Sequence, residues 1–478
     1  MDKFSDLYCN PVPLPELPLG MDRVFPGWQA AGYTVKPCDY REIADPEILP
    51  FEGKYYCYVS CRQVYVSSDL IHWEYCPIDI DFPLGYAPAV TRCGDNVYLT
   101  CSIRKNDSMA RIYAGKHPLG PFKTLGAPKD KNGQIIEDFL DPALFTDDDG
   151  RVYLYWGYAP VGGGIYGMEV DPERPDCGIS DIVKLIEFDP ENEWEHFGQH
   201  GEMLDFGWDE GASMYKRNGI YYLQYACCGT RFPAYGIGVY MLNSPLEIPT
   251  RRATRLCGSR NGCGIVGGTG HGGMFTGPGG KTFQAYSVLV RQKHQFERRI
   301  GIDPVTFDEN NIPFVHVSSV PQSVSNGDVG LVNGAAWKNV QVSSLQENIM
   351  PLYAVDECPH TVWYPAADDR EPVITVNLER EFVIPALRII FSEQNLDVQG
   401  NVPITPVKYL VRFLDSSQKP LEFAIDATDN QRDMLICFHS FAPVKAQYVQ
   451  VVIKNNNAPV LYGVTDLAVF VEPRYVNS

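Results

Sequence analysis

The sequence predicts an all-β protein: a five-bladed β-propeller followed by an antiparallel β-sandwich. The first observation is a repeated unit of two alternating apolar runs joined by a tight turn that contains glycine. Glycine supplies the positive φ that such hairpin turns need, and five copies at intervals of 41 to 69 residues fit four-stranded blades. The second observation is a change of period near residue 337, after which separated alternating runs are typical of a β-sandwich. The turn glycines are Gly53, Gly94, Gly150, Gly219 and Gly280.

The composition is that of a globular protein that is rich in aromatic residues and strongly acidic. Of its 478 residues 45% are hydrophobic, 28 are Tyr and 23 are Phe, as is common in all-β folds. The net charge of −19 argues against nucleic acid or an anionic membrane as a partner, since both need basic patches. No apolar run approaches the ~18 residues of a membrane span. The charge is compatible with a neutral substrate such as a sugar.

The N-terminus and the cysteines bear on the compartment. The first residues lack the apolar core of a signal peptide, so we expect a cytoplasmic protein, or a secreted one if a signal was removed. The 14 cysteines are scattered, and several lie within apolar strand patterns, which favours reduced, buried thiols over disulfides. No Cys-x-x-Cys pair occurs, so we expect no zinc site.

Four segments follow from composition and pattern. Residues 1–24 are rich in proline and form either an extended arm or a disordered tail. Residues 25–316 hold the five repeats, and residues 317–336 have the Ser, Gly and Asn content of a linker. Residues 337–478 form the sandwich. Its strands are expected at residues 373–378, 386–391, 409–413 and 448–453.

One position of each repeat concentrates polar side chains. It lies eight or nine residues before the turn glycine, where the strand that lines the central channel would begin. Equivalent positions in five blades converge on one axis, so these side chains should meet. Because an unpaired buried carboxylate is costly, three acids in this register point to function rather than to packing. The five residues are Asp45, Tyr86, Asp141, Glu210 and His271.

Three acids in one channel can act as acid and base at the same pH. Burial and mutual repulsion move their pKa values apart, so that one stays ionised as a base while another stays protonated as an acid. Glycoside hydrolysis requires such a pair of carboxyl groups. We therefore expect Asp45, Asp141 and Glu210 to be catalytic and an oligosaccharide to be the substrate. No organic cofactor is expected, because the Gly-rich stretch around His271 lacks the Lys-Ser/Thr of a phosphate loop.

Further residues are candidates for contact with the substrate. Tyr86 is either a sugar platform or part of the channel lining. Trp208 lies two residues before Glu210 and either stacks on a sugar ring or packs within its blade. Of Arg298 and Arg299, one is expected to pair with a channel acid or a substrate hydroxyl, and the other to be a surface charge.

Four motifs, in order and at blade spacing, resemble glycoside hydrolase family 43 over about residues 25–316. The resemblance implies a five-bladed propeller and hydrolysis with inversion of the anomeric configuration. The motifs are Ala44-Asp-Pro-Glu-Ile-Leu-Pro-Phe-Glu-Gly-Lys-Tyr-Tyr56, Asp141-Pro-Ala-Leu-Phe with Asp149-Gly-Arg-Val-Tyr-Leu-Tyr-Trp156, Glu210-Gly-Ala-Ser-Met-Tyr-Lys-Arg-Asn-Gly-Ile-Tyr-Tyr-Leu223, and Gly268-Thr-Gly-His271.

The same resemblance implies a role for each matched residue. Asp45 would be the general base that activates water, and Glu210 the general acid that protonates the leaving oxygen. Asp141 would raise the pKa of the acid and orient it. His271 would hold a cation, commonly calcium, in the channel, often through water. Arg299 would contact the sugar in the deepest subsite.

Two departures from known patterns stand out. Many relatives carry an acid soon after Ala-Pro in the second blade, where this chain has Tyr86-Ala-Pro-Ala-Val. The C-terminal segment resembles a discoidin-like (coagulation factor 5/8 type) carbohydrate-binding module over about residues 335–473, but Asn377 replaces the usual Asp, so the module either binds sugar or only braces the propeller. The matching stretches are Ala354-Val-Asp-Glu-Cys-Pro-His-Thr-Val-Trp363, Ile374-Thr-Val-Asn-Leu378 and Ala446-Gln-Tyr-Val-Gln-Val-Val452.

Together these expectations describe an exo-acting, inverting glycosidase of plant-polysaccharide fragments, an α-L-arabinofuranosidase or a β-xylosidase. An inverting pair would place the carboxyl groups of Asp45 and Glu210 ~6.5–9.5 Å apart, whereas a retaining pair would be ~5 Å apart. The alternatives are a galactosidase or galactofuranosidase of the same family, or a non-catalytic sugar-binding propeller marked by the loss of an acid. Retaining five-bladed sucrose and fructan hydrolases rank low, because their Asn-Asp-Pro-Asn and Arg-Asp-Pro motifs are absent.

Overall fold

The structure is a computed structural model that describes most of the chain. Among the residues that it describes, the regular elements are β-strands and two short 3-10 turns, η2 (Pro278–Gly280) and η3 (Pro351–Ala354), and the all-β prediction is confirmed. Within the described ranges, no helix has the length and apolar character needed to cross a membrane. The described residues are 3–15, 43–60, 63–80, 84–102, 111–137, 139–160, 162–250, 253–258, 264–290, 298–394, 406–457 and 460–473.

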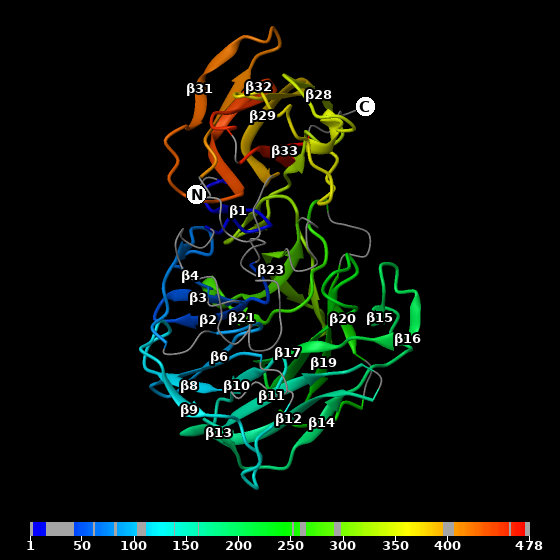
Figure 1. The fold of residues 1–478 in the computed structure, drawn as a ribbon. Helices are drawn as coiled ribbons and strands as arrows, with labels where there is room; N and C mark the ends of the chain where they lie inside the picture. The colour runs from blue at the N-terminus through cyan, green and yellow to red at the C-terminus, as the bar shows by residue number, and fades with distance from the viewer. Residues whose placement is uncertain are drawn as a thin grey trace. The chain divides into compact units, whose positions relative to one another are not determined.

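The chain divides into two compact units. The first lies largely between residues 43 and 317, and its described residues form five successive antiparallel sheets, four with four strands and the third with five (Figure 1). The strands of the first three sheets are β2 (Glu47–Phe51), β3 (Lys54–Val59), β4 (Gln63–Ser67) and β5 (Glu74–Tyr75); β6 (Ala89–Cys93), β7 (Asn96–Thr100), β8 (Ile112–Gly115) and β9 (Lys123–Gly126); β10 (Ala143–Thr146), β11 (Val152–Tyr158), β12 (Gly164–Asp171) and β13 (Arg174–Gly178), with β14 (Val183–Ile186) also pairing with β12.

The fourth and fifth sheets complete the unit. A separate hairpin is inserted between the third and the fourth sheet. The strands of the hairpin are β15 (His196–Phe197) and β16 (Met203–Gly207), and those of the last two sheets are β17 (Glu210–Arg217), β18 (Ile220–Cys227), β19 (Gly236–Leu242) and β20 (Thr254–Gly258); β21 (Met274–Thr276), β22 (Thr282–Leu289), β23 (Arg298–Phe307) and β24 (Pro313–Val315).

The first strands of the five sheets close into a ring. Strand β2 packs on β6, β6 on β10, β10 on β17 and β17 on β21, and β21 returns to β2. This circuit is that of a five-bladed propeller, so the predicted fold of the unit is confirmed. The second strands are covered by neighbouring blades, because every side chain of β22 and all but the first of β18 are buried.

The predicted turn glycines join the first and second strands of the blades. Glu52 and Gly53 have φ values of 47° and 78°, and Asn218 and Gly219 have values of 52° and 79°. Two consecutive positive φ values are the mark of a type I′ turn, whose twist matches that of the strands it connects. The local turn chemistry therefore fixes where each blade begins.

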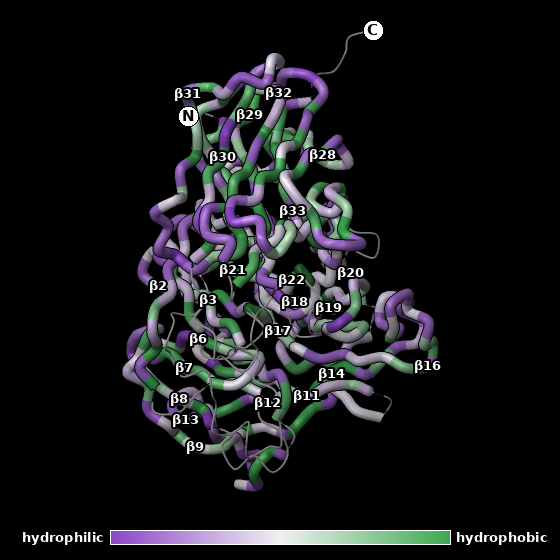
Figure 2. Tube along the Cα trace, turned by 45° about the horizontal axis from the view of Figure 1, so that its top comes forward, coloured by the Kyte–Doolittle hydropathy of each residue, from purple (hydrophilic) through white to green (hydrophobic). Residues whose placement is uncertain are grey.

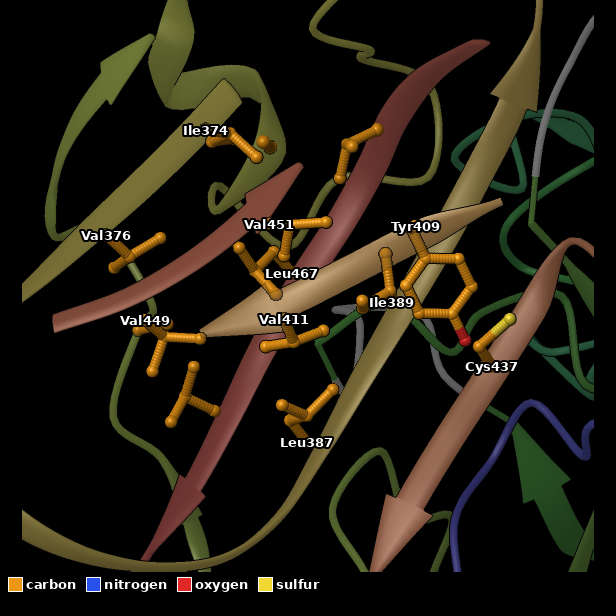
Figure 3. Close-up of a cluster of buried hydrophobic side chains, with 14 of the residues drawn as sticks. Ile374, Val376, Leu387, Ile389, Tyr409, Val411, Cys437, Val449, Val451 and Leu467 are labelled. Atoms are coloured by element: carbon orange, nitrogen blue, oxygen red, sulfur yellow. The ribbon is translucent and has the colours of Figure 1, made fainter. Parts of the chain in front are cut away.

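The second unit contains a seven-stranded antiparallel sheet and a large hydrophobic core. Side chains from four of its strands meet in this core (Figure 3), and hydrophobic segments recur along the strands of both units (Figure 2). Strands β29 and β32 are long, and two shifts in their register bend the pair. A discoidin-like module here stays a prediction. The strands are β27 (Val332–Asn333), β28 (Asn339–Val342), β29 (Val373–Glu393), β30 (Tyr409–Leu414), β31 (Pro420–Ala427), β32 (Ile436–Ile453) and β33 (Tyr462–Val471).

Residues 3–15 are part of this second unit. Strand β1 (Leu7–Tyr8) pairs with β25 (Gln322–Ser323), which in turn pairs with β26 (Gly327–Asp328). The sequence suggested a linker at residues 317–336, yet β25, β26 and β27 lie there, because the N-terminal segment and β33 supply them with hydrogen-bond partners. Leu7 is buried in the same cluster as Phe470.

Arg388 holds three segments of the second unit together. Its side chain is 1% exposed, and its Nε and Nη2 donate to Oδ2 of Asp466 at 3.1 and 3.0 Å. Its Nη1 donates to the carbonyl oxygen of Ser319 at 2.8 Å and also to that of Asn10. A charge buried this deeply is tolerated only while its partners are present.

Loss of Arg388 should strongly destabilise the second unit. We expect Arg388→Ala to lower the free energy of unfolding by about 3–5 kcal/mol, because Asp466 is then left buried without its partner. The matched control is Lys445→Ala, which breaks an exposed pair with Glu381 and should cost less than ~1 kcal/mol. Urea unfolding measures both variants, and equal losses would contradict the prediction.

Candidate active site

The first strand of each blade follows, or in the fourth blade contains near its start, a residue with left-handed backbone. Aspartate, histidine and glycine adopt this conformation more readily than other residues, whereas alanine adopts it with strain. The shared conformation and place in the blade identify five equivalent positions around the ring. They are Asp45 (φ 54°), Ala87 (47°), Asp141 (43°), Gly211 (61°) and His271 (49°).

Two of the predicted ring residues stand one place before these positions. The carbonyl oxygen of Tyr86 accepts from the amide of Ser102 at 2.8 Å, just as that of Ala44 accepts from the amide of Ser60 at 2.9 Å. Tyr86 is therefore the counterpart of Ala44, which precedes the first aspartate. Glu210 also stands one residue before the left-handed position of its blade, Gly211, and the register of β17 shifts directly after Glu210. Counting back from the turn glycines does not detect such an irregularity.

Asp45 is the most firmly held of the three acids. Nη1 of Arg298 donates to its Oδ1 at 2.6 Å and Nη2 to its Oδ2 at 3.1 Å, and both side chains are 4% exposed. The hydroxyl of Ser60 donates to Oδ2 at 2.6 Å, and the backbone N–H of Asp45 donates to Oγ of Ser287 at 3.0 Å. Burial opposes ionisation, but the charges of Arg298 and His271 and the bond from Ser60 outweigh it and hold the pKa of Asp45 below its usual range.

Asp141 and His271 lie beside Asp45. The hydroxyl of Ser102 donates to Oδ1 of Asp141 at 2.5 Å and accepts from its backbone N–H at 2.6 Å. Nδ1 of His271 lies 3.5 Å from Oδ1 of Asp45 and 3.8 Å from Oδ2 of Asp141. The imidazole of His271 therefore lies between the two aspartates. Gly211 permits this approach, because a Cβ atom there would stand 2.7 Å from Nδ1 of His271.

Glu210 is the acid that keeps its proton at neutral pH. Burial of its carboxyl group and the charge of Asp141 raise its pKa to about 8, and Asp45 adds to the effect. Nε1 of Trp208 donates to Oε2 at 2.7 Å, and the hydroxyl of Tyr235 donates to Oε1 at 3.4 Å. The ring therefore holds one ionised and one protonated carboxyl group at the same pH.

The predicted substrate contacts take different places. The indole of Trp208 stacks on Tyr158 with 5.1 Å between ring centroids, and its N–H is used by Glu210, so this side chain orients the acid. Arg298 is the arginine that pairs with a channel acid, Asp45. Arg299 is also buried, at 5% exposed, so the prediction that the other arginine is a surface charge is wrong. Its Nη1 donates to the carbonyl oxygen of Arg298 at 2.8 Å. Sugar contacts by Arg299, by Tyr86 and by the indole face stay predictions.

Several site residues were missed from the sequence. The serines that bind the two aspartates recur 15 or 16 residues after the left-handed positions, and this spacing could have revealed them. Glu47, two residues after Asp45, was also missed. Burial raises the pKa of its carboxyl group to about 8, and a Cβ atom on Gly273 would lie 2.7 Å from both its Oε2 and Oγ of Ser213. Its carboxyl group therefore lies beside Gly273, close to the first strand of the fifth blade.

A cation held by His271 stays a prediction. In the part of the chain that the structure describes, no group of three or more His, Cys, Asp or Glu side chains is arranged to hold a metal ion. Nδ1 of His271 faces the two aspartates.

Comparisons with known proteins agree with this geometry. The model of glycosyl hydrolases family 43 matches residues 36–313. The beta-D-galactofuranosidase xynD of Aspergillus niger is 25% identical over 301 residues, which cover 57% of this chain and 76% of that protein. Xylosidase/arabinosidase 43B of Humicola insolens is 26% identical over 281 residues, 53% of this chain and 48% of that protein.

A solved structure of a glycoside hydrolase shows the same fold. It covers 90% of this chain and 97% of its own length, with a TM-score of 0.50 and 18% sequence identity. The family model covers more than half of the chain, and its span includes all three acids of the ring. The chain therefore belongs to glycosyl hydrolases family 43.

Proposed function

We propose that this protein is an exo-acting, inverting glycoside hydrolase that removes terminal α-L-arabinofuranosyl or β-xylosyl groups from plant-polysaccharide fragments. The observation that carries the proposal is the pairing of an ionised Asp45 with a protonated Glu210 at the centre of one ring. Two relatives whose names include xylosidase/arabinosidase, from Humicola insolens and Butyrivibrio fibrisolvens, support the choice of sugars.

The two carboxyl groups supply the two proton transfers of hydrolysis. Glu210 gives its proton to the glycosidic oxygen while the bond between this oxygen and the anomeric carbon breaks. Asp45 takes a proton from a water molecule, whose oxygen forms the new bond to the anomeric carbon from the opposite face. The negative charge of Asp141 helps Glu210 to regain its proton before the next turnover, because it raises the pKa of that carboxyl group.

A galactofuranosidase is the second candidate. It is favoured by the relative from Aspergillus niger, which carries that name and aligns over 76% of its own length. A sugar-binding propeller without catalytic activity is disfavoured, because all three acids are present and two of them are held by serine hydroxyls. The sugar itself is set by side chains around the ring, so it has to be measured.

Hydrolysis of 4-nitrophenyl glycosides tests the proposed function directly. We expect the wild-type protein to release nitrophenol from the arabinofuranoside or the xyloside, and Glu210→Gln to be much slower on the same substrate. Selective cleavage of the galactofuranoside would favour the second candidate. Failure on this panel and on arabinoxylan oligosaccharides would refute hydrolysis of these sugars.

Loss of the acid should depend on the leaving group. Glu210→Ala should lower kcat by about 10²–10⁴ on oligosaccharides, whose alkoxide leaving groups need a proton, and far less on 4-nitrophenyl glycosides. The control is Glu202→Ala, which removes an exposed acid from the β15–β16 hairpin. Equal losses of the Glu210 variant on both kinds of substrate would argue against its role as general acid.

The alkaline limb of the pH profile should report Glu210. We expect kcat/KM to fall as the pH rises through about 8, because the acid then loses the proton that it must donate. Trp208→Phe removes a hydrogen bond that favours the ionised form, so the limb should move to higher pH. Trp73→Phe removes a comparable bond to Leu70 in the first blade and should leave the limb in place. A shift of the Trp208 variant to lower pH would contradict this assignment.

A further inference from the structure

Three serines occupy one position in the first, second and fifth blades. The backbone amides of Ser60, Ser102 and Ser287 each donate to the residue just before the left-handed position of their own blade, at 2.9, 2.8 and 2.9 Å. The shared bond shows that the three positions are equivalent. Each hydroxyl is therefore presented to the ring from the same place.

Each of these hydroxyls also joins its blade to the next one. It accepts the backbone N–H of the left-handed residue in the following blade, at 3.0, 2.6 and 3.0 Å. A left-handed conformation at a residue other than glycine is strained and persists only where its surroundings hold it. The hydroxyls are part of what holds it. The bonded pairs are Ser60 with Ala87, Ser102 with Asp141, and Ser287 with Asp45.

The same hydroxyls meet the carboxylates. Ser60 donates to Oδ2 of Asp45 at 2.6 Å, and Ser102 donates to Oδ1 of Asp141 at 2.5 Å. Oγ of Ser287 lies 3.5 Å from Oδ1 of Asp45. Both the backbone and the side chain of each aspartate are thus fixed by serine.

Asp45 also links the first blade to the fifth. Its N–H is bonded to Ser287 on β22, and its carboxylate is paired with Arg298 on β23. The amide of Ile43 donates to the carbonyl oxygen of Arg298 at 3.0 Å. Contacts between the first and last blades close a propeller, because no continuous chain joins them there. The ring therefore closes through a residue of the site.

We propose that Ser60, Ser102 and Ser287 are positioning residues, which fix the carboxylates of Asp45 and Asp141 through the same hydroxyls that join neighbouring blades. The catalytic part of this inference, that the serines position carboxylates for hydrolysis, rests on the proposed function. It adds that the placement of the two aspartates and the closure of the propeller depend on one set of bonds.

The third blade offers an internal comparison. There the equivalent position is Gly157, whose amide donates to the carbonyl oxygen of Leu140 at 2.8 Å. The left-handed residue of the next blade is Gly211, and glycine adopts this conformation without strain. A hydroxyl is missing from this position in the third blade, where the next left-handed residue is glycine. It is also missing in the fourth blade, where Ala226 pairs with Glu210 and the next left-handed residue is His271.

Kinetics of single serine variants test the positioning role. We expect Ser60→Ala and Ser102→Ala each to lower kcat about tenfold while KM changes less than about twofold, because misplaced carboxylates affect the transition state more than sugar binding. Ser60→Thr and Ser102→Thr keep the hydroxyl and should recover most of the activity. Ser60→Cys and Ser102→Cys fill the volume without a strong hydrogen bond, so they should resemble the alanine variants.

A buried serine elsewhere in the first blade serves as the control. Ser67 is 2% exposed, and its hydroxyl donates to Oδ1 of Asp69 at 3.0 Å in a turn after β4. Ser67→Ala should lower the melting temperature without changing kcat. If Ser60→Ala and Ser102→Ala show only this pattern, the serines are structural and the inference is wrong.

The closure of the ring can be tested without any substrate. We expect Ser287→Ala and Asp45→Gly to be coupled, because glycine adopts the left-handed conformation without support from the Ser287 hydroxyl. The double variant should then lose less stability in urea unfolding than the sum of the two single losses. Additive losses would overturn the link between the first and fifth blades. A wild type inactive on every sugar would refute the proposed function and leave this result standing.

Discussion

The ion pair between Asp45 and Arg298 is the constraint on which the ring and its chemistry both depend. Each partner is 4% exposed, and a charge in such a place is stable only with a close opposite charge and further hydrogen bonds. The arginine comes from β23 of the fifth blade, so it reaches the aspartate of the first blade only when the propeller is closed. The ionised base is thus a product of the complete fold and is absent from any single blade.

The same centre holds carboxyl groups in opposite protonation states. Asp45 accepts two bonds from a guanidinium, a short bond from the hydroxyl of Ser60 and a longer one from that of Ser287, which favour its charged form. Glu210 is half-buried as a residue, and the desolvation of its carboxyl group, together with the negative charge of Asp141, favours its neutral form. If both carboxyl groups had the same surroundings, they would have similar pKa values and the same protonation state. The division of roles therefore comes from which blade supplies the cation and which supplies the second carboxylate.

Much of the fold could be predicted because its signals are local. Turns such as Glu52–Gly53 carry their conformation in two residues, and they mark the blades wherever they occur. The three acids were found because they recur near one place in the repeat. The choice between Arg298 and Arg299 was not predictable, because neighbours on a strand face opposite sides and the sequence does not say which side meets the axis.

Other features depend on irregular or distant structure. The bulge after Glu210 and the place of Tyr86 beside the left-handed position are irregularities of one residue, smaller than the variation in blade length. The pairing of β1 with β25 joins two residues to two others far along the chain, and no periodicity marks such short strands. Trp208 was predicted to stack on a sugar through its aromatic face, whereas in the structure its N–H donates a hydrogen bond to Glu210.

The pairing of β1 with β25 has a consequence for the order of synthesis. Leu7 leaves the ribosome early, but its partner Ser323 is made only after every blade of the propeller. At about 5–20 residues per second, roughly 15–60 s pass before the two can meet. During this interval Leu7 and Cys9 lack the hydrophobic cluster in which they are finally buried with Phe470. Strand β1 can therefore complete its pairing only after the five blades have been synthesised.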